Sequence, residues 1–312
     1  MTADFMHKTV ALKFRLGEFV FFSARFSGFV RDSVLAMAAR ECVEPDELAV
    51  LLREVDVVYT PSYPVGAQLP RLSAYGDAFR YVPVQYDRFY IEIKGSFEDY
   101  LGKFSSKTRS TLKRKARKFA EHSGGQIKCC EFVKPEEMLE FHKLARQVAE
   151  LTYQERLLGG ALPAGEKFCE EMQELSRNDR VRAYVLFCET QPIAYLYCPM
   201  TDGVLVYDFL GYDPSYSDWS PGTVLQYVVL ERLFREGRNL VFDFTEGAGP
   251  HKALFATNCI PCGDIYYFRR SIRSILIVCL HALVVTLSRS VTGAAKLIGV
   301  KSWLKKLIRS KA

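Results

Sequence analysis

The stretch from Val204 to Lys252 constrains the fold more than any other part of this sequence. It runs from an apolar strand through a polar turn into Ser220-Pro-Gly-Thr223, and continues as an amphipathic helix, a second apolar strand and a glycine-rich loop. Serine suits the N-cap position and proline the first helical position. Because the first N–H groups of a helix have no partner inside it, Pro221, Gly222 and Thr223 are expected to frame a phosphate-binding helix start.

The elements around this stretch follow from apolar periodicity and turn residues. The helix that begins at Pro221 is predicted to end at Glu236, before Gly237. Val10–Val30 predicts either a hairpin or a strand and a helix, and four prolines predict that Tyr59–Tyr86 is mostly loop. The other predicted helices are 45–53, 103–121, 135–151 and 163–177. The other predicted strands are 55–59, 89–93, 126–132, 182–189, 192–199, 203–210, 240–244 and 265–269, of which 182–189 and 192–199 are expected to form a hairpin about Thr190 and Gln191. This order favours a mixed α/β sheet with helices on both faces.

Charge is distributed unevenly along the chain. Its formal net charge is +6, but Arg269–Ala312 carries ten Lys/Arg and no acidic residue, so the remaining chain is mildly acidic. The nine cysteines are scattered, and the pair Cys259 and Cys262 has no second pair or spaced histidines for zinc. No signal peptide is evident at the N-terminus. We therefore expect reduced thiols, no metal and a cytoplasmic location.

Several short motifs occur together in one order. They are Phe97-Glu-Asp-Tyr-Leu, Ser106-Lys-Thr-Arg109-Ser-Thr-Leu112-Lys-Arg114, Pro192-Ile-Ala194, Tyr212-Asp-Pro214, Ser220-Pro-Gly222, Asp243, Gly247 and Lys252. In this order they resemble the GNAT acyltransferase superfamily, most closely its CelD-type branch associated with cellulose and exopolysaccharide biosynthesis. They are similar, more distantly, to Fem-type peptidyltransferases. The resemblance implies a GNAT fold, with a degenerate GNAT-like half over residues 1–95, an acyltransferase domain over 96–270 and a basic amphipathic tail over 271–312.

The resemblance also implies acetyl-CoA, or another acyl-CoA, as the donor. Its pyrophosphate would lie at Ser220–Thr223, and backbone N–H groups of a splayed strand, Asp208–Gly211, would polarise the thioester carbonyl. The sequence departs from the family in two respects. No Gln/Arg-x-x-Gly-x-Gly/Ala loop precedes Pro221, and His251-Lys252 stands where the CelD-type branch commonly has Tyr-Lys.

Acyl transfer needs a general base close to the nucleophile. Asp243 ends a predicted strand, and ligands gather at the carboxyl ends of strands in α/β sheets. Asp243 is therefore the first candidate, followed by His251 and Glu246. Tyr212 could donate a proton to the leaving thiolate. Each of these residues has an ordinary structural alternative, such as a turn cap for Asp243 or a solvated loop for His251.

Candidate substrate-binding residues come from two places. Gly247 and Lys252 lie in the glycine-rich loop, where glycine permits close approach to a ligand. Lys107 and Arg109 belong to the segment 103–118, which has eight basic residues and no acidic ones. Such a cluster can bind nucleic acid, but no recognised nucleic-acid motif accompanies it, so a solvated or anion-binding helix face is favoured.

The C-terminal tail has a membrane-surface composition. Ile275–Leu287 is apolar but shorter than the ~20 residues that a span needs. Beyond it, Leu297, Leu304 and Ile308 share a helical face beside Trp303, and basic residues occupy another. This pattern favours peripheral contact at the inner face of the membrane, with packing on protein as the alternative.

These observations predict an acyltransferase that moves an acetyl group from acetyl-CoA to an amine or hydroxyl of a sugar-type acceptor for surface polysaccharide. One rival is Fem-like aminoacyl transfer from charged tRNA. The other is a non-catalytic scaffold that holds a polysaccharide-assembly complex at the membrane.

Overall fold

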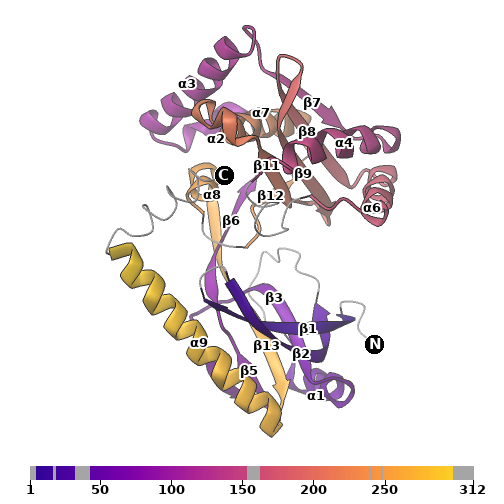
Figure 1. The fold of residues 1–312 in the computed structure, drawn as a ribbon, viewed down its shortest axis with the longest axis vertical. Helices are drawn as coiled ribbons and strands as arrows, with labels where there is room; N and C mark the ends of the chain where they lie inside the picture. Colours follow the sequence, from indigo (N-terminus) through magenta and orange to yellow (C-terminus); the bar gives the residue numbers. More distant parts are fainter. Residues whose placement is uncertain are drawn as a thin grey trace. The chain divides into compact units, whose positions relative to one another are not determined.

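The computed structural model describes residues 5–16, 19–31, 43–152, 162–238, 240–246 and 249–297, without the side chains of 16, 19, 250, 251 and 289–297. The chain divides into a central unit, Asp87–Cys259, and a terminal unit made of Met1–Tyr86 and Ile260–Ala312. Figure 1 shows both. This division differs from the boundaries expected at 95/96 and 270/271. The reason is that β13 (Asn258–Arg269) pairs with N-terminal strands and α9 (Ile272–Leu297) packs on β1.

The central unit is built on a mixed sheet whose strand order is β6-β12-β10-β9-β8-β7, with β11 also beside β9. Only the β10–β12 pair in this part is parallel. The strands are β6 (Gln85–Glu92), β7 (Lys128–Phe132), β8 (Val181–Cys188), β9 (Gln191–Thr201), β10 (Val204–Val206), β11 (Phe209–Tyr212) and β12 (Val241–Asp243).

Helices cover both faces of this sheet, because alternate side chains of β8 and β9 enter two different cores. Tyr184 and Leu196 join one core with α2 (Phe97–Gly102), α3 (Ser106–His122) and α7 (Pro221–Glu236). Val185 and Tyr197 join the other with α4 (Met138–Ala149) and α6 (Glu166–Arg177). The predicted mixed α/β sheet with helices on both faces is thereby confirmed. The short elements are η1 (Pro135–Glu137), η2 (Pro214–Trp219) and α8 (Pro250–Phe255).

Two local predictions in this unit agree closely with the structure. The hairpin expected around Thr190 and Gln191 is the antiparallel pair β8–β9. The helix predicted over Pro221–Glu236 has those bounds, and Gly237 adopts the left-handed conformation (φ 65°) that ends it.

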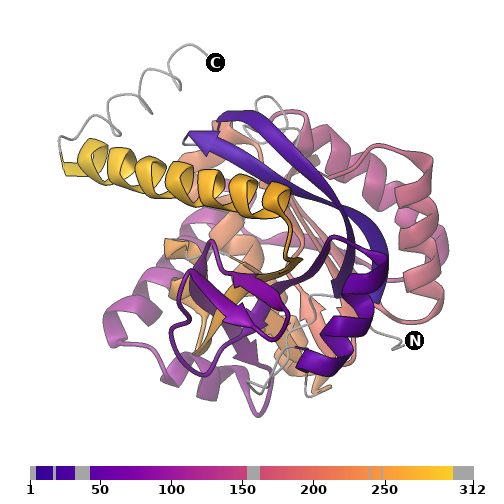
Figure 2. The same cartoon turned by 90° about the horizontal axis from the view of Figure 1, so that it is seen from below.

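The terminal unit contains a further group of strands. Its strands are β1 (Phe5–Leu16), β2 (Phe19–Arg31), β3 (Val57–Pro64), β4 (Leu72–Tyr75) and β5 (Ala78–Tyr81), together with β13. β1 and β2 form an antiparallel hairpin, so the first of the two alternatives for Val10–Val30 holds. The helices are α1 (Pro45–Glu54) and α9, which lies along the hairpin in Figure 2.

The expectation of a loop over Tyr59–Tyr86 is wrong, because this segment contributes to four strands. Pro61 and Pro64 misled the prediction. Both lie in β3 beyond Tyr59, where its pairing with β2 ends. Proline is tolerated there, because none of the described strands pairs with that edge of β3 beyond Tyr59 and needs the missing N–H.

Candidate functional site

The central sheet opens where β10 and β12 end. The parallel pairing runs from Val204 beside Val241 to Val206 beside Asp243, and the Tyr207 N–H donates the last bond to the Asp243 carbonyl at 2.8 Å. The chain after β12 then bonds to β6, through the Phe244 N–H and the Phe89 carbonyl. Beyond this point β11 pairs with β9. Ligands bind at such carboxyl ends of parallel strands in α/β sheets.

A β-bulge lies at this opening. Leu205 is opposite Met200 and Phe209 is opposite Tyr197, so one extra residue is inserted on the β10–β11 side. Asp208 falls in the bulge, where its N–H donates to the Tyr197 carbonyl. Its side chain is exposed, yet the surrounding protein desolvates the carboxylate and raises its pKa to about 6. An exposed carboxylate with this pKa is suited to accept a proton near neutral pH. The alternation of apolar and polar residues along the predicted strand did not identify Asp208 as a candidate.

α7 begins close to β11. A Cβ on Gly222 would lie 3.5 Å from Leu210 and 3.6 Å from Tyr212, so the first turn of α7 lies against β11. Pro221 occupies the first helical position as predicted, but Ser220 does not cap through its hydroxyl. Ser220 has φ 53° and ψ 50°, and it is its carbonyl that accepts from the N–H groups of Thr223 and Val224. The left-handed backbone conformation of Ser220 sets the direction in which α7 begins.

Helix α3 brings two lysines to the beginning of α7. Lys115 Nζ lies 3.4 Å from Thr223 Oγ1, and Lys118 Nζ donates to the Asp218 carbonyl at 3.3 Å. Burial, with a smaller contribution from Arg114, lowers the pKa of Lys115. The sequence had pointed instead to Lys107 and Arg109, which lie about two turns earlier on α3.

Those two predicted residues have other surroundings. Lys107 is exposed, and the Arg109 guanidinium donates to the Phe104 carbonyl at 2.8 Å and to the Gly102 carbonyl at 3.4 Å. Arg109 therefore ties α3 to the end of α2. It also lines a shallow surface hollow with other α3 side chains: Ser106, Ser110, Lys113, Arg114 and Arg117.

Gly211 and Tyr212 lie on β11 beside this helix start. A Cβ on Gly211 would be 2.4 Å from the ring of Tyr195, so glycine is required for the ring to cross β11. This packing gives Gly211 a structural reason besides the donor contact predicted for it. Tyr212 is 37% exposed, and its ring is next to Gly222, where it can reach a ligand held by α7.

Asp243 is fully buried in an ion pair with Arg88, which comes from β6. Arg88 Nε donates to both carboxylate oxygens at 3.0 and 3.1 Å, Arg88 Nη2 adds a further bond, and the Thr245 N–H donates to Oδ1 at 3.0 Å. These donors occupy the lone pairs that a general base needs. Nothing in the sequence near Arg88 signals a partner 155 residues away.

The segment after β12 places further charged groups near the ion pair of Arg88 and Asp243. Lys252 is buried, and its Nζ donates to the Glu246 carbonyl. Burial lowers the pKa of Lys252, while the carboxylates of Asp243 and Glu246 act in the opposite direction. The Glu246 side chain is exposed. Gly247 and the side chain of His251 lie outside the described residues, although the backbone of His251 belongs to α8.

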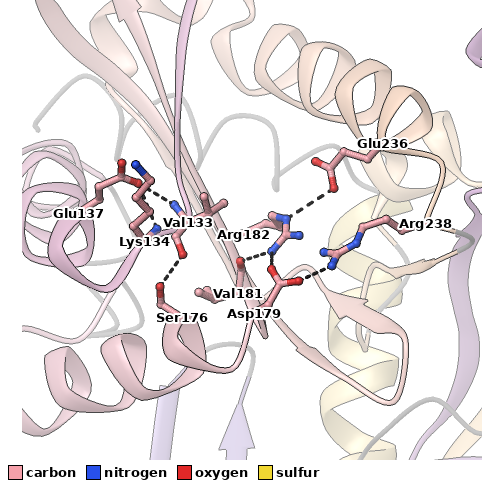
Figure 3. A network of polar contacts seen from close by, with 9 residues as sticks. All are labelled: Val133, Lys134, Glu137, Ser176, Asp179, Val181, Arg182, Glu236 and Arg238. Carbon is pink, nitrogen blue, oxygen red and sulfur yellow. Dashed lines mark hydrogen bonds and ion pairs between the residues drawn. The ribbon is translucent and has the colours of Figure 1, made fainter.

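The far end of α7 is fixed by a second charged network, drawn in Figure 3. Arg182, at the start of β8, is 6% exposed and donates to Asp179 at 2.8 Å and pairs with Glu236 at 3.7 Å. Arg238 also bonds to Asp179 and, as the main cause, lowers the pKa of that carboxyl. Because Glu236 ends α7, this network anchors the helix against the sheet.

No group of three or more His, Cys, Asp or Glu side chains in the described part of the chain is arranged to hold a metal ion.

Residues 106–253 match the family model described as an acetyltransferase (GNAT) domain. No curated protein sequence matches the chain.

Several solved structures are similar to this chain at low sequence identity. One is a DUF2156 domain from Agrobacterium fabrum, assigned provisionally to the C-terminus of a lysylphosphatidylglycerol synthetase, with TM-score 0.51, 10% identity and coverage of 82% of this chain and 84% of that one. Another is L-PGS from Bacillus licheniformis, with TM-score 0.48, 13% identity and coverage of 84% of this chain and 85% of that one. A third is FemX, with TM-score 0.49, 10% identity and coverage of 86% of this chain and 89% of that one. The match of residues 106–253 to the acetyltransferase (GNAT) domain model identifies the protein as an acyltransferase.

Proposed function

We propose that the protein transfers an acyl group from acyl-CoA to an amine or hydroxyl at the opening between β10 and β12. The observation that carries this proposal is the joint position of the strand opening, the bulge at Asp208 and the start of α7 beside β11. Following the CelD-type resemblance, the proposed donor is acetyl-CoA and the proposed acceptor is a sugar or amino sugar of a surface polysaccharide.

The donor diphosphate is assigned to the first turn of α7. The N–H group of Gly222 lies at the positive end of the helix dipole, which favours an anion. Lys115 supplies a positive charge next to Thr223, and its partial burial strengthens its interaction with a phosphate. This assignment keeps Ser220–Thr223 as the phosphate site and replaces Lys107 and Arg109 with Lys115.

The chemical step is assigned to Asp208 and Tyr212. Asp208 accepts the proton that the acceptor amine or hydroxyl loses as it attacks the thioester carbonyl, because its carboxylate is exposed and its pKa is about 6. The hydroxyl of Tyr212 gives a proton to the departing thiolate of coenzyme A. Asp243, with Arg88, holds Lys252 and the loop after β12 in place, and Lys252 and Glu246 border the acceptor.

Calorimetry with acetyl-CoA tests the donor assignment. A hydrogen bond to a charged group contributes about 1.5–3 kcal/mol, so Lys115→Gln should raise the dissociation constant of acetyl-CoA by about tenfold or more. Lys113→Gln is the matched control, because Lys113 is exposed on the same helix and lines the separate surface hollow. Equal affinities of the two variants would contradict the placement of the diphosphate.

A second candidate is aminoacyl transfer from charged tRNA. It is favoured by one observation, the hollow of α3 that Arg109, Lys113, Arg114 and Arg117 line, since several basic groups on one face suit a phosphate backbone. Titration of the wild-type protein with aminoacyl-tRNA and with acetyl-CoA separates the candidates. Binding of tRNA alone supports this one, and binding of neither ligand supports the non-catalytic scaffold.

A further inference from the structure

Helix α9 is held against the terminal unit through one face. Its His281 is buried, with Nδ1 2.7 Å from the Tyr81 hydroxyl and Nε2 3.3 Å from the Lys13 carbonyl. The ring of His281 also meets Phe14 of β1 edge-on at 4.9 Å. Ser274 and Val278 are buried on the same face, so the rotation of α9 about its axis is fixed.

The opposite face of α9 exposes a row of large apolar side chains. With 3.6 residues per turn, residues spaced by three or four share one face. Ile272 is 81% exposed and Leu276 64% exposed, and the remaining three are all more than half exposed. We call these five residues the apolar stripe: Ile272, Leu276, Leu280, Leu283 and Leu287. A contiguous exposed row of this kind marks an interaction surface.

Aromatic side chains at the start of β2 adjoin this helix. Phe21 and Phe22 are each 53% exposed, and Val20 is 39% exposed. The ring centroids of Phe21 and Phe22 lie 6.3 and 5.2 Å from that of Phe14. The Phe14 ring also packs against His281. The exposed phenylalanines are therefore separated from α9 by one buried ring.

Basic side chains predominate on the elements that carry this surface. The described residues of β1 and β2 carry five basic side chains and no acidic one: Lys8, Lys13, Arg15, Arg25 and Arg31. The sequence from Arg269 to Ala312 likewise has no acidic residue. Basic groups beside exposed leucine and phenylalanine are the composition of surfaces that bind anionic lipid.

We propose that the apolar stripe of α9, with Phe21 and Phe22, docks the terminal unit on the surface of an anionic lipid bilayer. The helix would lie in the interface, because its other face is packed on β1 and cannot meet lipid. None of the described helices combines the length and apolar character needed to cross a bilayer. A second copy is the less suitable partner, since the same surface would bring the same positive charges together.

Vesicle flotation of the full chain tests the proposal. The wild-type protein should float with vesicles of 30% phosphatidylglycerol and 70% phosphatidylcholine, should bind pure phosphatidylcholine more weakly, and should lose affinity as NaCl rises. Leu276→Ser combined with Leu280→Ser should weaken binding to the mixed vesicles by at least about tenfold. Both positions are exposed, so the fold should tolerate the change.

The matched control is Leu139→Ser combined with Val50→Thr. Leu139 on α4 is 53% exposed, like Leu280, and Val50 on α1 is 57% exposed. This control should bind vesicles like the wild type. Absence of wild-type binding to the mixed vesicles, or equal binding by the two double variants, overturns the proposal. The proposal is also overturned if sedimentation shows a dimer of the wild type that the Leu276 and Leu280 changes dissociate, while vesicle flotation is unaffected by them.

Discussion

The buried ion pair between Arg88 and Asp243 makes a sharp prediction about what Asp243 does. Replacing Asp243 with Asn keeps the size of the side chain but removes the charge that compensates Arg88. Both side chains are almost completely buried, at 3% and 0% exposure, so water cannot replace the lost partner. Breaking such a pair from one side costs about 3–5 kcal/mol. Lys252, whose pKa Asp243 helps to hold up, loses a stabilising charge at the same time.

This cost is a large share of the total stability of a domain, which is about 5–15 kcal/mol. For a unit of this size each kcal/mol shifts the melting temperature by about 2–4 °C, so Asp243→Asn should lower it by about 6–20 °C. Circular dichroism during heating, with urea unfolding at 25 °C, measures the change. The Arg117–Glu121 pair is the control, because both side chains are mostly exposed (76% and 69%), and Glu121→Gln should cost less than about 1 kcal/mol.

The same variant separates the two roles of Asp243. If it is a general base, kcat of the folded variant should fall by about 10²–10⁴ while the melting temperature stays close to that of the wild type. If it is a structural partner of Arg88, stability should fall and kcat of the remaining folded protein should change little. A melting temperature within about 2 °C of the wild type refutes our reasoning about the ion pair. Removing both charges, with Arg88→Met and Asp243→Leu, should recover part of the lost stability.

Three further outcomes follow from the structure. The pH profile of kcat/KM should fall below pH of about 6, where Asp208 gains its proton, and Asp208→Asn should abolish that limb as well as most activity. Gly211→Ala should lower the free energy of unfolding by about 1–3 kcal/mol in urea titrations, because its Cβ would clash with Tyr195, whereas Gly222→Ala has only ordinary contacts and should be neutral for stability. Burial lowers the pKa of His281 below its usual 6.5, so its contribution to stability is full above pH 6.5 and is lost as the pH falls through its lowered pKa; His281→Gln should flatten that part of the stability profile.

Elements with strong local signals could be predicted from the sequence. The proline at its first position and the glycine after its end defined α7 to the residue. The turn residues at 190–191 defined the β8–β9 hairpin. Proline was misleading in β3, because its effect depends on whether a neighbouring strand needs that N–H.

The strand end and the helix start that frame the candidate site could be predicted from the sequence, while the contacts between its side chains could not. The sequence indicated Asp243 as a strand-end carboxylate, but its burial depends on Arg88, which only the pairing of β6 with β12 brings near. The choice of Lys115 over Lys107 depends on how α3 is rotated against α7, and a run of basic residues around a helix does not encode that rotation. Asp208 owes its position to the inserted residue of a bulge, which alternation along one strand cannot reveal.

The division of the chain has a consequence for how the protein is made. The central unit is one continuous segment, Asp87–Cys259, and both of its cores are complete once that segment has been translated. The terminal unit must wait, because β3 pairs with β13 and a bond such as that from Thr60 to the Ile265 carbonyl joins residues 205 apart. Until the last part of the chain emerges from the ribosome, β3 presents an open strand edge, which is the kind of surface on which chaperones and misfolding compete.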